Sequence, residues 1–281
     1  EGLEYIQIAS GAQQTHFPTQ TPLTVVVWNT FKGRRERYYD VLAAQAGDAD
    51  LILLQEFRHD PTLEAAHQQL FAERDAGMVV GFYTQANHTA PTGVCTISSA
   101  RAMRTIFLLS RYREHPRAAR RAHPRIAGRA HRRAAHCRSV HTPALVAPSR
   151  PGPVARTPKT KIRDRRRACV GGEQQPPEEA LVVLNSHGIN FRLRRPFLDQ
   201  MLQFEAQLRH HRGPMILVGD FNTWERGRVR ILEELAGTLG LQAVRFPPGV
   251  KTFRGHELDR VYVRGGEVRQ PRVVVDRLAS D

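Results

Sequence analysis

The chain has 281 residues, enough for one large α/β domain or two small ones, and 41% of them are hydrophobic, as in an ordinary globular protein. The longest apolar runs have only the length of strands, which excludes a membrane-spanning segment, and residues 1–20 show no signal peptide, which favours the cytoplasm. The net charge of +15 points to an anionic partner such as nucleic acid, while three scattered cysteines exclude a disulfide framework and a cysteine metal site.

Strands and helices alternate along most of the chain. The first half contains predicted strands at 23–29, 49–56 and near 79–83, 93–98 and 104–109. Predicted helices lie between them at 34–47 and from Asp60, a typical N-cap, to about Ala76. The second half contains predicted strands at 180–187, 215–222, 257–265 and 271–278, with helices at 195–211 and 227–240. Alternation that ends in paired strands predicts a mixed-sheet α/β fold with helices covering the sheets.

The positive charge is concentrated in one segment. Residues 113–167 contain 17 of the 42 basic and 2 of the 27 acidic residues, which leaves 25 of each sign elsewhere. The segment is rich in Arg, Ala, His and Pro, and it has no aromatic residue and no sustained period of 2 or 3.6. A basic arm that binds phosphate backbones is one interpretation; a disordered insertion or an out-of-frame stretch is the other. We favour the second, because nucleic-acid grooves usually interleave aromatic residues with basic ones.

Polar side chains follow several of the predicted strands. Asn29 ends the first, Glu56 ends the second, Asp220 and Asn222 lie at the end of a later one, and Asp259 lies within the next. Open α/β sheets place their sites at the C-terminal edges of strands. Carboxylate and amide oxygens suit a hard cation such as Mg²⁺. These residues are therefore candidates for a metal-dependent site.

Each candidate also has a purely structural interpretation. Asn29 could cap a turn, and Glu56 could be a charge at the rim of a sheet. The sequence GDFN could form a tight turn at Gly219 and Asp220. His187 can titrate near neutrality, but it could equally be a satisfied structural histidine. No single residue establishes a site, whereas the combination in this order is far more specific.

In this order, the segments VVVWN, LILLQE, NSHGINF, ILVGDFN and LDRVYV resemble the motifs of the endonuclease/exonuclease/phosphatase superfamily. This superfamily includes pancreatic deoxyribonuclease, exonuclease III-type repair nucleases, sphingomyelinases and inositol-polyphosphate phosphatases. The resemblance is greatest to its poorly characterised bacterial branch, and it covers about residues 23–110 and 180–281. It implies a four-layered α/β sandwich of two mixed β-sheets flanked by helices. Residues 23–281 would form this domain, 1–22 an N-terminal extension, and 113–167 a basic insertion.

The resemblance also implies roles for individual residues. Glu56 would ligate Mg²⁺, or Mn²⁺ in its place, with Asn29 beside it in the metal site. Asp220 and Asn222 would position the attacking water and the scissile phosphate, with Asp220 as the base. His187 would hydrogen-bond a phosphate oxygen or help to protonate the leaving group.

Further roles concern residues at the margins of these motifs. Asn190 and Lys32 would add phosphate contacts, and Asp259 would orient the second catalytic histidine of the family. That histidine belongs to a Ser-Asp-His motif, which LASD matches as Ser280 and Asp281, with Asp281 near the metal. The histidine expected next is absent from the chain. We therefore expect a chain cut one residue short, which hydrolyses phosphodiesters hardly above background.

Two hypotheses for function follow. The leading one is a monomeric, divalent-metal-dependent hydrolase of phosphodiester, or of phosphomonoester, bonds. Nucleic acid is its favoured substrate, ahead of a phospholipid head group or an inositol phosphate, although the neutral balance outside 113–167 argues against tight duplex binding. The alternative is a catalytically incomplete protein that binds phosphate or nucleic acid through the basic segment.

Overall fold

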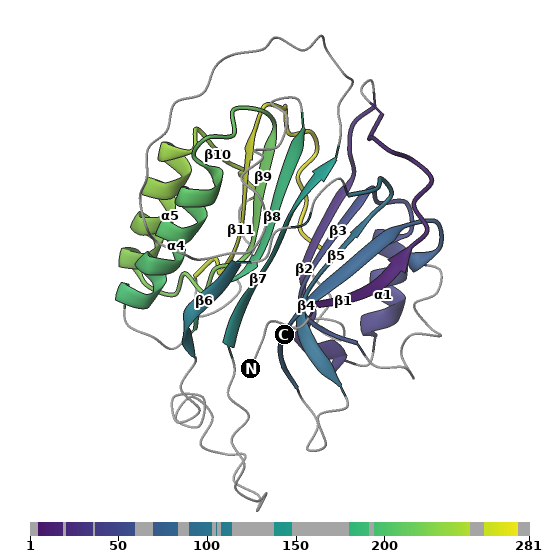
Figure 1. Ribbon diagram of the computed structural model, residues 1–281, viewed down its shortest axis with the longest axis horizontal. Helices are drawn as coiled ribbons and strands as arrows, with labels where there is room; N and C mark the ends of the chain where they lie inside the picture. Colours follow the sequence, from purple (N-terminus) through teal and green to yellow (C-terminus); the bar gives the residue numbers. More distant parts are fainter. Residues whose placement is uncertain are drawn as a thin grey trace, which may run out of the picture.

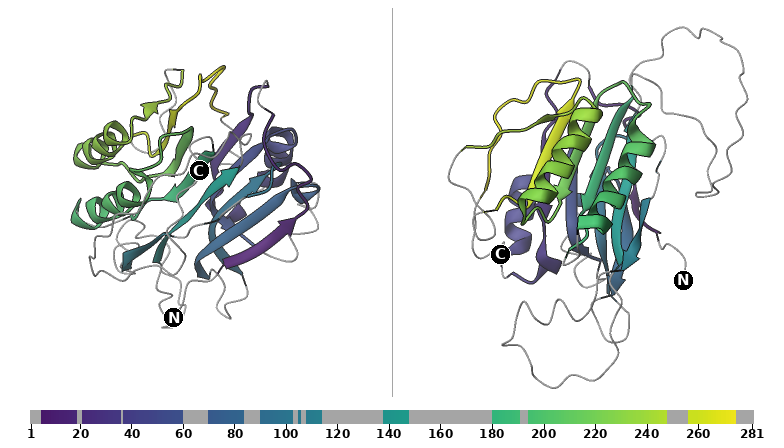
Figure 2. Two further views of the ribbon diagram at one scale, coloured as in Figure 1. Left: turned by 45° about the horizontal axis from the view of Figure 1, so that its top comes forward. Right: turned by 90° about the vertical axis from the view of Figure 1, so that its left-hand side faces the viewer.

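A computed structural model of the protein describes residues 5–18, 21–35, 37–59, 70–83, 90–102, 105, 108–113, 138–147, 180–190, 194–247 and 256–274. These residues form two β-sheets that face each other, with helices on the outer face of each sheet (Figure 1, Figure 2). The fold is the four-layered α/β sandwich of two mixed sheets expected from the sequence. Among the described residues, none of the helices has the length and apolar character needed to span a bilayer.

The first sheet has the strand order β1-β4-β5-β3-β2. Its strands are β1 (Tyr5–Ser10), β2 (Val25–Asn29), β3 (Leu51–Arg58), β4 (Asp75–Tyr83) and β5 (Pro91–Ser98). A short 3-10 helix, η1 (Phe31–Gly33), and helix α1 (Tyr38–Ala46) follow β2, and α1 covers the outer face of the sheet (Figure 1). Strands β2 and β3 are parallel, so Asn29 lies beside Gln55 at one edge.

The second sheet has the strand order β10-β11-β9-β8-β7-β6. Its strands are β6 (Leu108–Arg113), β7 (Arg138–Ala147), β8 (Leu181–His187), β9 (Met215–Asp220), β10 (Gln242–Ala243) and β11 (Asp259–Arg264). Helices α4 (Arg194–Leu208) and α5 (Arg226–Thr238) cover its outer face (Figure 2). Strands β8 and β9 are parallel, and His187 lies beside Asp220 where both strands end.

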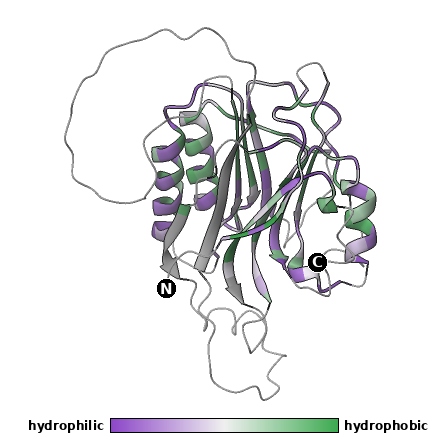
Figure 3. Ribbon diagram, turned by 45° about the vertical axis from the view of Figure 1, so that its right-hand side comes forward, coloured by the Kyte–Doolittle hydropathy of each residue, from purple (hydrophilic) through white to green (hydrophobic). Residues whose placement is uncertain are grey.

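Successive side chains of a strand point to opposite faces of its sheet, and this alternation builds the core. In β3, Ile52 packs against the cluster beneath α1, whereas Leu51 and Leu53 face the second sheet. Val183 of β8 and Val218 of β9 meet them from the other side. Hydrophobic residues therefore fill the space between the sheets as well as the space beneath the helices. The ribbon of Figure 3 shows stretches of hydrophobic residues, in green, along strands of both sheets.

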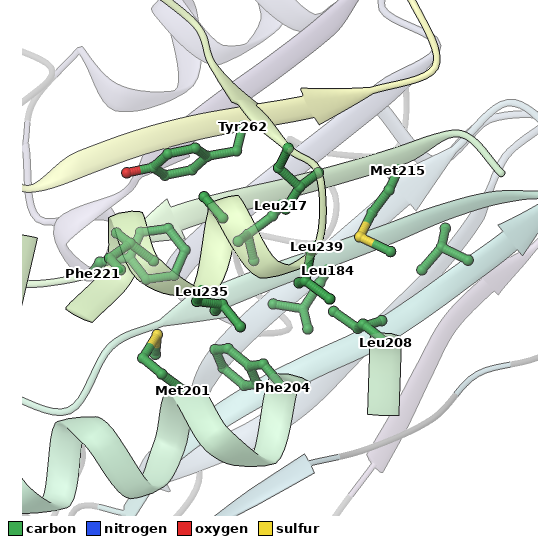
Figure 4. Packing of buried hydrophobic residues seen from close by; sticks show 14 of the residues in the cluster. Leu184, Met201, Phe204, Leu208, Met215, Leu217, Phe221, Leu235, Leu239 and Tyr262 are labelled. Carbon is green, nitrogen blue, oxygen red and sulfur yellow. The ribbon is translucent and has the colours of Figure 1, made fainter. Parts of the chain in front are cut away.

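Helices α4 and α5 close the core on the outer face of the second sheet. Leu184 and Leu217 point away from the first sheet and pack with Met201 and Phe204 of α4 and Leu235 of α5 (Figure 4). All five side chains are at most 4% exposed. The apolar face of each helix thus fixes it on the sheet that carries His187 and Asp220, so these ends of β8 and β9 have a rigid support.

Two strands lie where the sequence predicted no regular element. β1 falls inside the expected N-terminal extension 1–22, yet it pairs with β4 and packs Ile6 and Ile8 against the first core cluster. β7 falls inside the basic segment 113–167 and pairs with β8. Its register is irregular between His141 and Ala144, where Pro143 has no N–H to donate. The rest of the basic segment beyond Arg113 lies outside the described residues.

Two other predicted elements need correction. β4 begins at Asp75, and Ala76 and Met78 pack beneath α1, so the helix expected to reach about Ala76 ends earlier. Residues 60–69 lie outside the described residues. The strand expected at 271–278 is not found in 271–274, where Val273 and Val274 are 40% and 49% exposed. The remainder of that segment is not described.

Gly219 lets β9 approach β8 at the residue before Asp220. Its φ is +150°, and a Cβ there would collide with the backbone carbonyl of Ser186. We expect Gly219→Ala to lower the free energy of unfolding by about 3 kcal/mol, measured by urea denaturation. Gly237→Ala in α5 is the matched control, because nothing lies within 4 Å of the added Cβ. The control should stabilise the protein by about 0.5–1 kcal/mol, and equal urea midpoints for the two variants would contradict the close approach.

Candidate active site

Three of the predicted site residues continue the rows of core residues that face the opposite sheet. Asn29, His187 and Asp220 each lie two or four residues after a valine that packs between the sheets. By the alternation of strands, all three side chains point into the space between the sheets. They lie at the ends of two parallel strand pairs, one pair in each sheet. The sequence therefore brings them together from both sheets at one end of the sandwich.

Glu56 reaches the same place through a β-bulge. Gln55 already faces the second sheet, where its Nε2 donates to Asn185 Oδ1 at 2.6 Å, so a regular strand would turn Glu56 the opposite way. Instead Glu56 has a φ of +50°, and the pairing of β3 with β5 loses its regular register around this residue. The bulge re-aims the Glu56 carboxylate toward His187. Backbone strain of this kind in a residue other than glycine is typical of functional sites.

His187 lies between two carboxylates. Its Nε2 is 3.8 Å from Glu56 Oε1 and 3.7 Å from Asp220 Oδ2. Asn29 Nδ2 donates a hydrogen bond of 3.0 Å to the same oxygen of Asp220. Lys32 Nζ contacts the other oxygen of Glu56. Five of the residues predicted from the sequence are thus joined in one network.

The two carboxyl groups differ in their surroundings. Burial raises the pKa of Asp220, and this effect is only partly offset by His187 and by the hydrogen bonds that the carboxylate accepts. Burial acts in the same direction on Glu56, but His187 and Lys32 outweigh it and lower the pKa of that carboxyl. Glu56 is therefore held as an anion, whereas Asp220 takes up a proton more readily. A metal ligand and a general base require this division of properties.

The loops that follow β8 and β9 are tied to each other. Asn222 N donates to Asp220 Oδ1 at 2.8 Å, and Asn222 Nδ2 donates to Gly188 O at 2.9 Å. Gly188 N in turn donates to Asp220 O at 2.6 Å. Asn222 is buried and has a φ of +51°, so its conformation is fixed by these contacts. Asn222 thereby holds the two loops that carry the site in one arrangement.

Arg228 supports the same loops, and sequence analysis did not identify it. This residue of α5 is 0% exposed, and its Nη1 donates to Ile189 O at 2.6 Å and to Asn222 O at 3.2 Å. Its Cζ lies 4.8 Å from the ring centroid of Phe197 and 4.9 Å from that of Trp224. An arginine in the first turn of a polar-faced helix is usually exposed, so the sequence carries no signal for this burial.

A buried polar seam connects the two sheets behind the site. Besides its bond with Gln55, Asn185 donates through Nδ2 to Cys95 O at 2.9 Å, and both amide residues are 0% exposed. Gln200 of α4 accepts a hydrogen bond of 3.1 Å from Ile189 N. Buried hydrogen bonds of this kind favour one relative position of the elements they join. Gln55 and Asn185 belong to the quoted motifs, but their partners could not be read from the sequence.

The remaining predicted residues lie around this centre. Asp259 begins β11 directly opposite Asp220 in the antiparallel register, and its side chain is exposed. Asn190 is half-buried in the loop after β8. Ser280 and Asp281 lie outside the described residues.

The oxygen ligands at this position fit a hard divalent cation. Glu56 supplies carboxylate oxygens, and Asn29 supplies an amide oxygen that accepts a hydrogen bond of 3.1 Å from Phe31 N. The described part of the chain has no group of three or more His, Cys, Asp or Glu residues placed to hold a metal ion. Mg²⁺ does not need one, because it usually binds through one or two carboxylates and keeps several waters. The residues present therefore fit Mg²⁺ better than a metal that prefers nitrogen or sulfur ligands.

Comparisons with known proteins identify the family to which this chain belongs. The model of the Endonuclease/Exonuclease/phosphatase family matches residues 26–281. A UPF0294 protein of Erwinia tasmaniensis is 32% identical over 264 residues, which cover 92% of this chain and 78% of the relative. A UPF0294 protein of Klebsiella pneumoniae is 30% identical over 275 residues, which cover 94% and 83%. The chain belongs to the endonuclease/exonuclease/phosphatase family, whose members are generally metal-dependent phosphoesterases.

Solved structures show the same fold at low sequence identity. A family protein from Leptotrichia buccalis has a TM-score of 0.58 at 13% identity, covering 92% of this chain and 96% of the other. The family protein from Beutenbergia cavernae has a TM-score of 0.56 at 13% identity, covering 92% and 69%. The catalytic domain of human Nocturnin has a TM-score of 0.50 at 13% identity, covering 93% and 84%.

Proposed function

We propose that this protein hydrolyses phosphodiester bonds with the help of a divalent metal ion, Mg²⁺ or Mn²⁺, and that its substrate is nucleic acid. One observation carries this function: carboxylates from two different sheets, Glu56 and Asp220, both lie within 3.8 Å of His187 Nε2. Membership of a family of phosphoesterases supports the same reaction class.

Each residue of the network has a role in this reaction. Glu56, with Asn29 beside it, holds the metal ion, which when bound neutralises charge on the phosphate and polarises its phosphorus–oxygen bonds. Asp220 takes a proton from the water whose oxygen bonds to phosphorus. His187 donates a hydrogen bond to a phosphate oxygen or a proton to the departing alcohol. Lys32 adds a positive charge beside the phosphate.

The proposed metal site is tested by Glu56→Gln. The substitution keeps the shape of the side chain and removes its charge, so the Mg²⁺ concentration for half-maximal activity should rise by at least about tenfold. The measurement is cleavage of a fluorescently labelled oligonucleotide across an Mg²⁺ titration. Glu234→Gln is the control, because the Glu234 side chain is 66% exposed on α5 and should leave the titration unchanged.

Two results would contradict these assignments in different ways. An unchanged Mg²⁺ titration in Glu56→Gln would remove Glu56 from the metal site. A wild-type protein that cleaves neither DNA, RNA nor a small phosphodiester at any Mg²⁺ or Mn²⁺ concentration would contradict the proposed reaction and favour the alternative, a catalytically incomplete protein that binds phosphate or nucleic acid.

A further inference from the structure

The loop after β2 has an unusual backbone. Phe31, Lys32 and Gly33 have φ values of +47°, +63° and +61°, so three consecutive residues adopt the left-handed region. Only glycine does so readily, because a Cβ crowds the following carbonyl oxygen. A loop that keeps two other residues in this region must be held by its surroundings.

The hydrogen bonds that hold the loop come from residues of the site. Asn29 Oδ1 accepts a hydrogen bond from Phe31 N at 3.1 Å. Gly33 N donates to Thr30 O, and Thr30 N donates to Gln55 O, both at 2.9 Å. The loop is therefore tied to the ends of β2 and β3, which carry the metal-binding residues of the first sheet. The backbone of the loop is thus held beside the candidate site.

The side chains of this loop combine an aromatic ring with positive charge. Around the ring centroid of Phe31 lie Lys32 Nζ at 5.5 Å, Arg34 Cζ at 5.8 Å and Arg35 Cζ at 5.5 Å. Arg34 and Arg35 are exposed, and the Phe31 residue is partly exposed. These distances are typical of cation–π contacts. The ring and the two guanidinium groups thus form one surface at the edge of the site.

Lys32 links this surface to the catalytic carboxylates. Its Nζ contacts Glu56 and lies near the same Phe31 ring that Arg34 and Arg35 approach. The aromatic and positively charged surface is therefore continuous with the metal-binding carboxylate of the first sheet.

We propose that Phe31, Arg34 and Arg35 form a second substrate subsite, at which a single-stranded nucleic acid binds with a flanking phosphate on the arginines and a base on the Phe31 ring. Proteins bind single strands by combining positive charges along the backbone with aromatic rings on which bases stack. Segment 113–167 has the charges without any aromatic residue, whereas this loop has both. This proposal rests on the proposed function and specifies that the nucleic acid substrate is single-stranded.

The subsite distinguishes between classes of phosphodiester. A phospholipid head group or a small aromatic diester has no second phosphate to reach the arginines. A duplex has flanking phosphates, but its bases are stacked within the helix and do not reach Phe31. Because the chain outside 113–167 carries 25 charges of each sign, this part of the chain can attract a substrate only through local groups of positive charge. A single strand is the substrate that uses every group of the surface.

The test compares two substrates with one set of variants. Arg34→Gln/Arg35→Gln and Phe31→Ala are assayed on a single-stranded oligonucleotide and on bis(4-nitrophenyl) phosphate. The control is Arg209→Gln/Arg230→Gln, which removes one exposed charge directly after α4 and one within α5, both on the outer side of the second sheet. For the oligonucleotide, we expect kcat/KM to fall at least about tenfold in both subsite variants, mainly through KM. In a plot of the logarithm of oligonucleotide affinity against the logarithm of salt concentration, the slope of the arginine variant should also be less steep by about 0.7 for each phosphate contact removed.

Activity on the small diester separates the subsite from the catalytic centre. It should change by less than about threefold in the subsite variants, since this substrate does not reach the loop. Equal losses on both substrates would overturn the subsite, as would an equal loss in the control. If wild-type protein cleaves neither substrate, the proposed function fails, and the subsite is decided by fluorescence anisotropy of the labelled oligonucleotide in EDTA. Equal affinity of wild type and the arginine variant in that measurement would overturn it.

Discussion

Asp220→Asn should lower kcat for phosphodiester cleavage by about 10²–10⁴-fold with little change in KM, because the amide cannot accept the proton of the attacking water. The substitution preserves the shape of the side chain, and an amide oxygen can still accept the 2.8 Å hydrogen bond from Asn222 N. Single-turnover kinetics at saturating Mg²⁺ measure the chemical step directly. A variant within threefold of the wild-type rate would show that Asp220 is not the base.

A double variant separates the loss of the base from any loss of structure. In Asp220→Asn the new amide nitrogen faces Asn29 Nδ2, which donates to Asp220 in the native protein at 3.0 Å. In the double variant with Asn29→Asp, the amide at position 220 can donate a hydrogen bond to the carboxylate at position 29. The direction of the native bond is then reversed, and the urea midpoint should return toward that of the wild type. The rate should not recover, because the carboxylate now lies on β2 instead of β9. Recovery of both would mean that Asp220 has a structural role alone.

Arg228→Ala should lower the free energy of unfolding by about 3 kcal/mol, measured by urea denaturation. The substitution leaves the carbonyl groups of Ile189 and Asn222 without their guanidinium donor and opens a space beside Phe197 and Trp224. It should also lower kcat, because these carbonyls belong to the loops that follow His187 and Asp220. If Arg228→Ala had the same urea midpoint as the wild type, the stabilising role of the buried Arg228 contacts would be contradicted.

Chemical rescue shows whether Arg228 acts by positioning the loops. Guanidinium at a few millimolar should re-occupy the space in Arg228→Ala and restore part of kcat, whereas the same concentration should leave the wild-type rate unchanged. Arg228→Lys keeps the charge but loses the planar fork of donors, so its kcat should lie between those of wild type and Arg228→Ala. Loss of stability with an unchanged kcat would assign Arg228 a structural role alone.

The positions of Asn29, His187 and Asp220 could be predicted from the sequence because they depend on local rules. Each ends an apolar strand, and the alternation of strands decides the face on which it lies. Glu56 was predicted as a site residue, but its orientation depends on a bulge that only the pairing of β3 with β5 reveals. Strand β7 likewise could not be predicted, because it is specified by its pairing with β8 and its own sequence has no clear period.

Arg228 could not be predicted because its environment is assembled from distant parts of the chain. Phe197 and Ile189 precede it by 31 and 39 residues, and nothing in the local sequence indicates that they surround a charge. The register between the sheets likewise rests on the pair Gln55 and Asn185, which are 130 residues apart. The local sequence pattern thus indicates the candidate site residues, whereas tertiary packing decides which other residues hold them in place.

The order of the two sheets along the chain has a consequence for synthesis on the ribosome. The first sheet is complete by Ser98, while β8 and β9 come from the second half of the chain. The hydrogen bond from Asn29 to Asp220 therefore joins residues 191 positions apart, and neither half contains both carboxylates. Contacts of such separation form late, because the long loop must close first. A nascent chain therefore cannot bring Glu56 and Asp220 into one site until β9 has been synthesised and the two sheets have packed together.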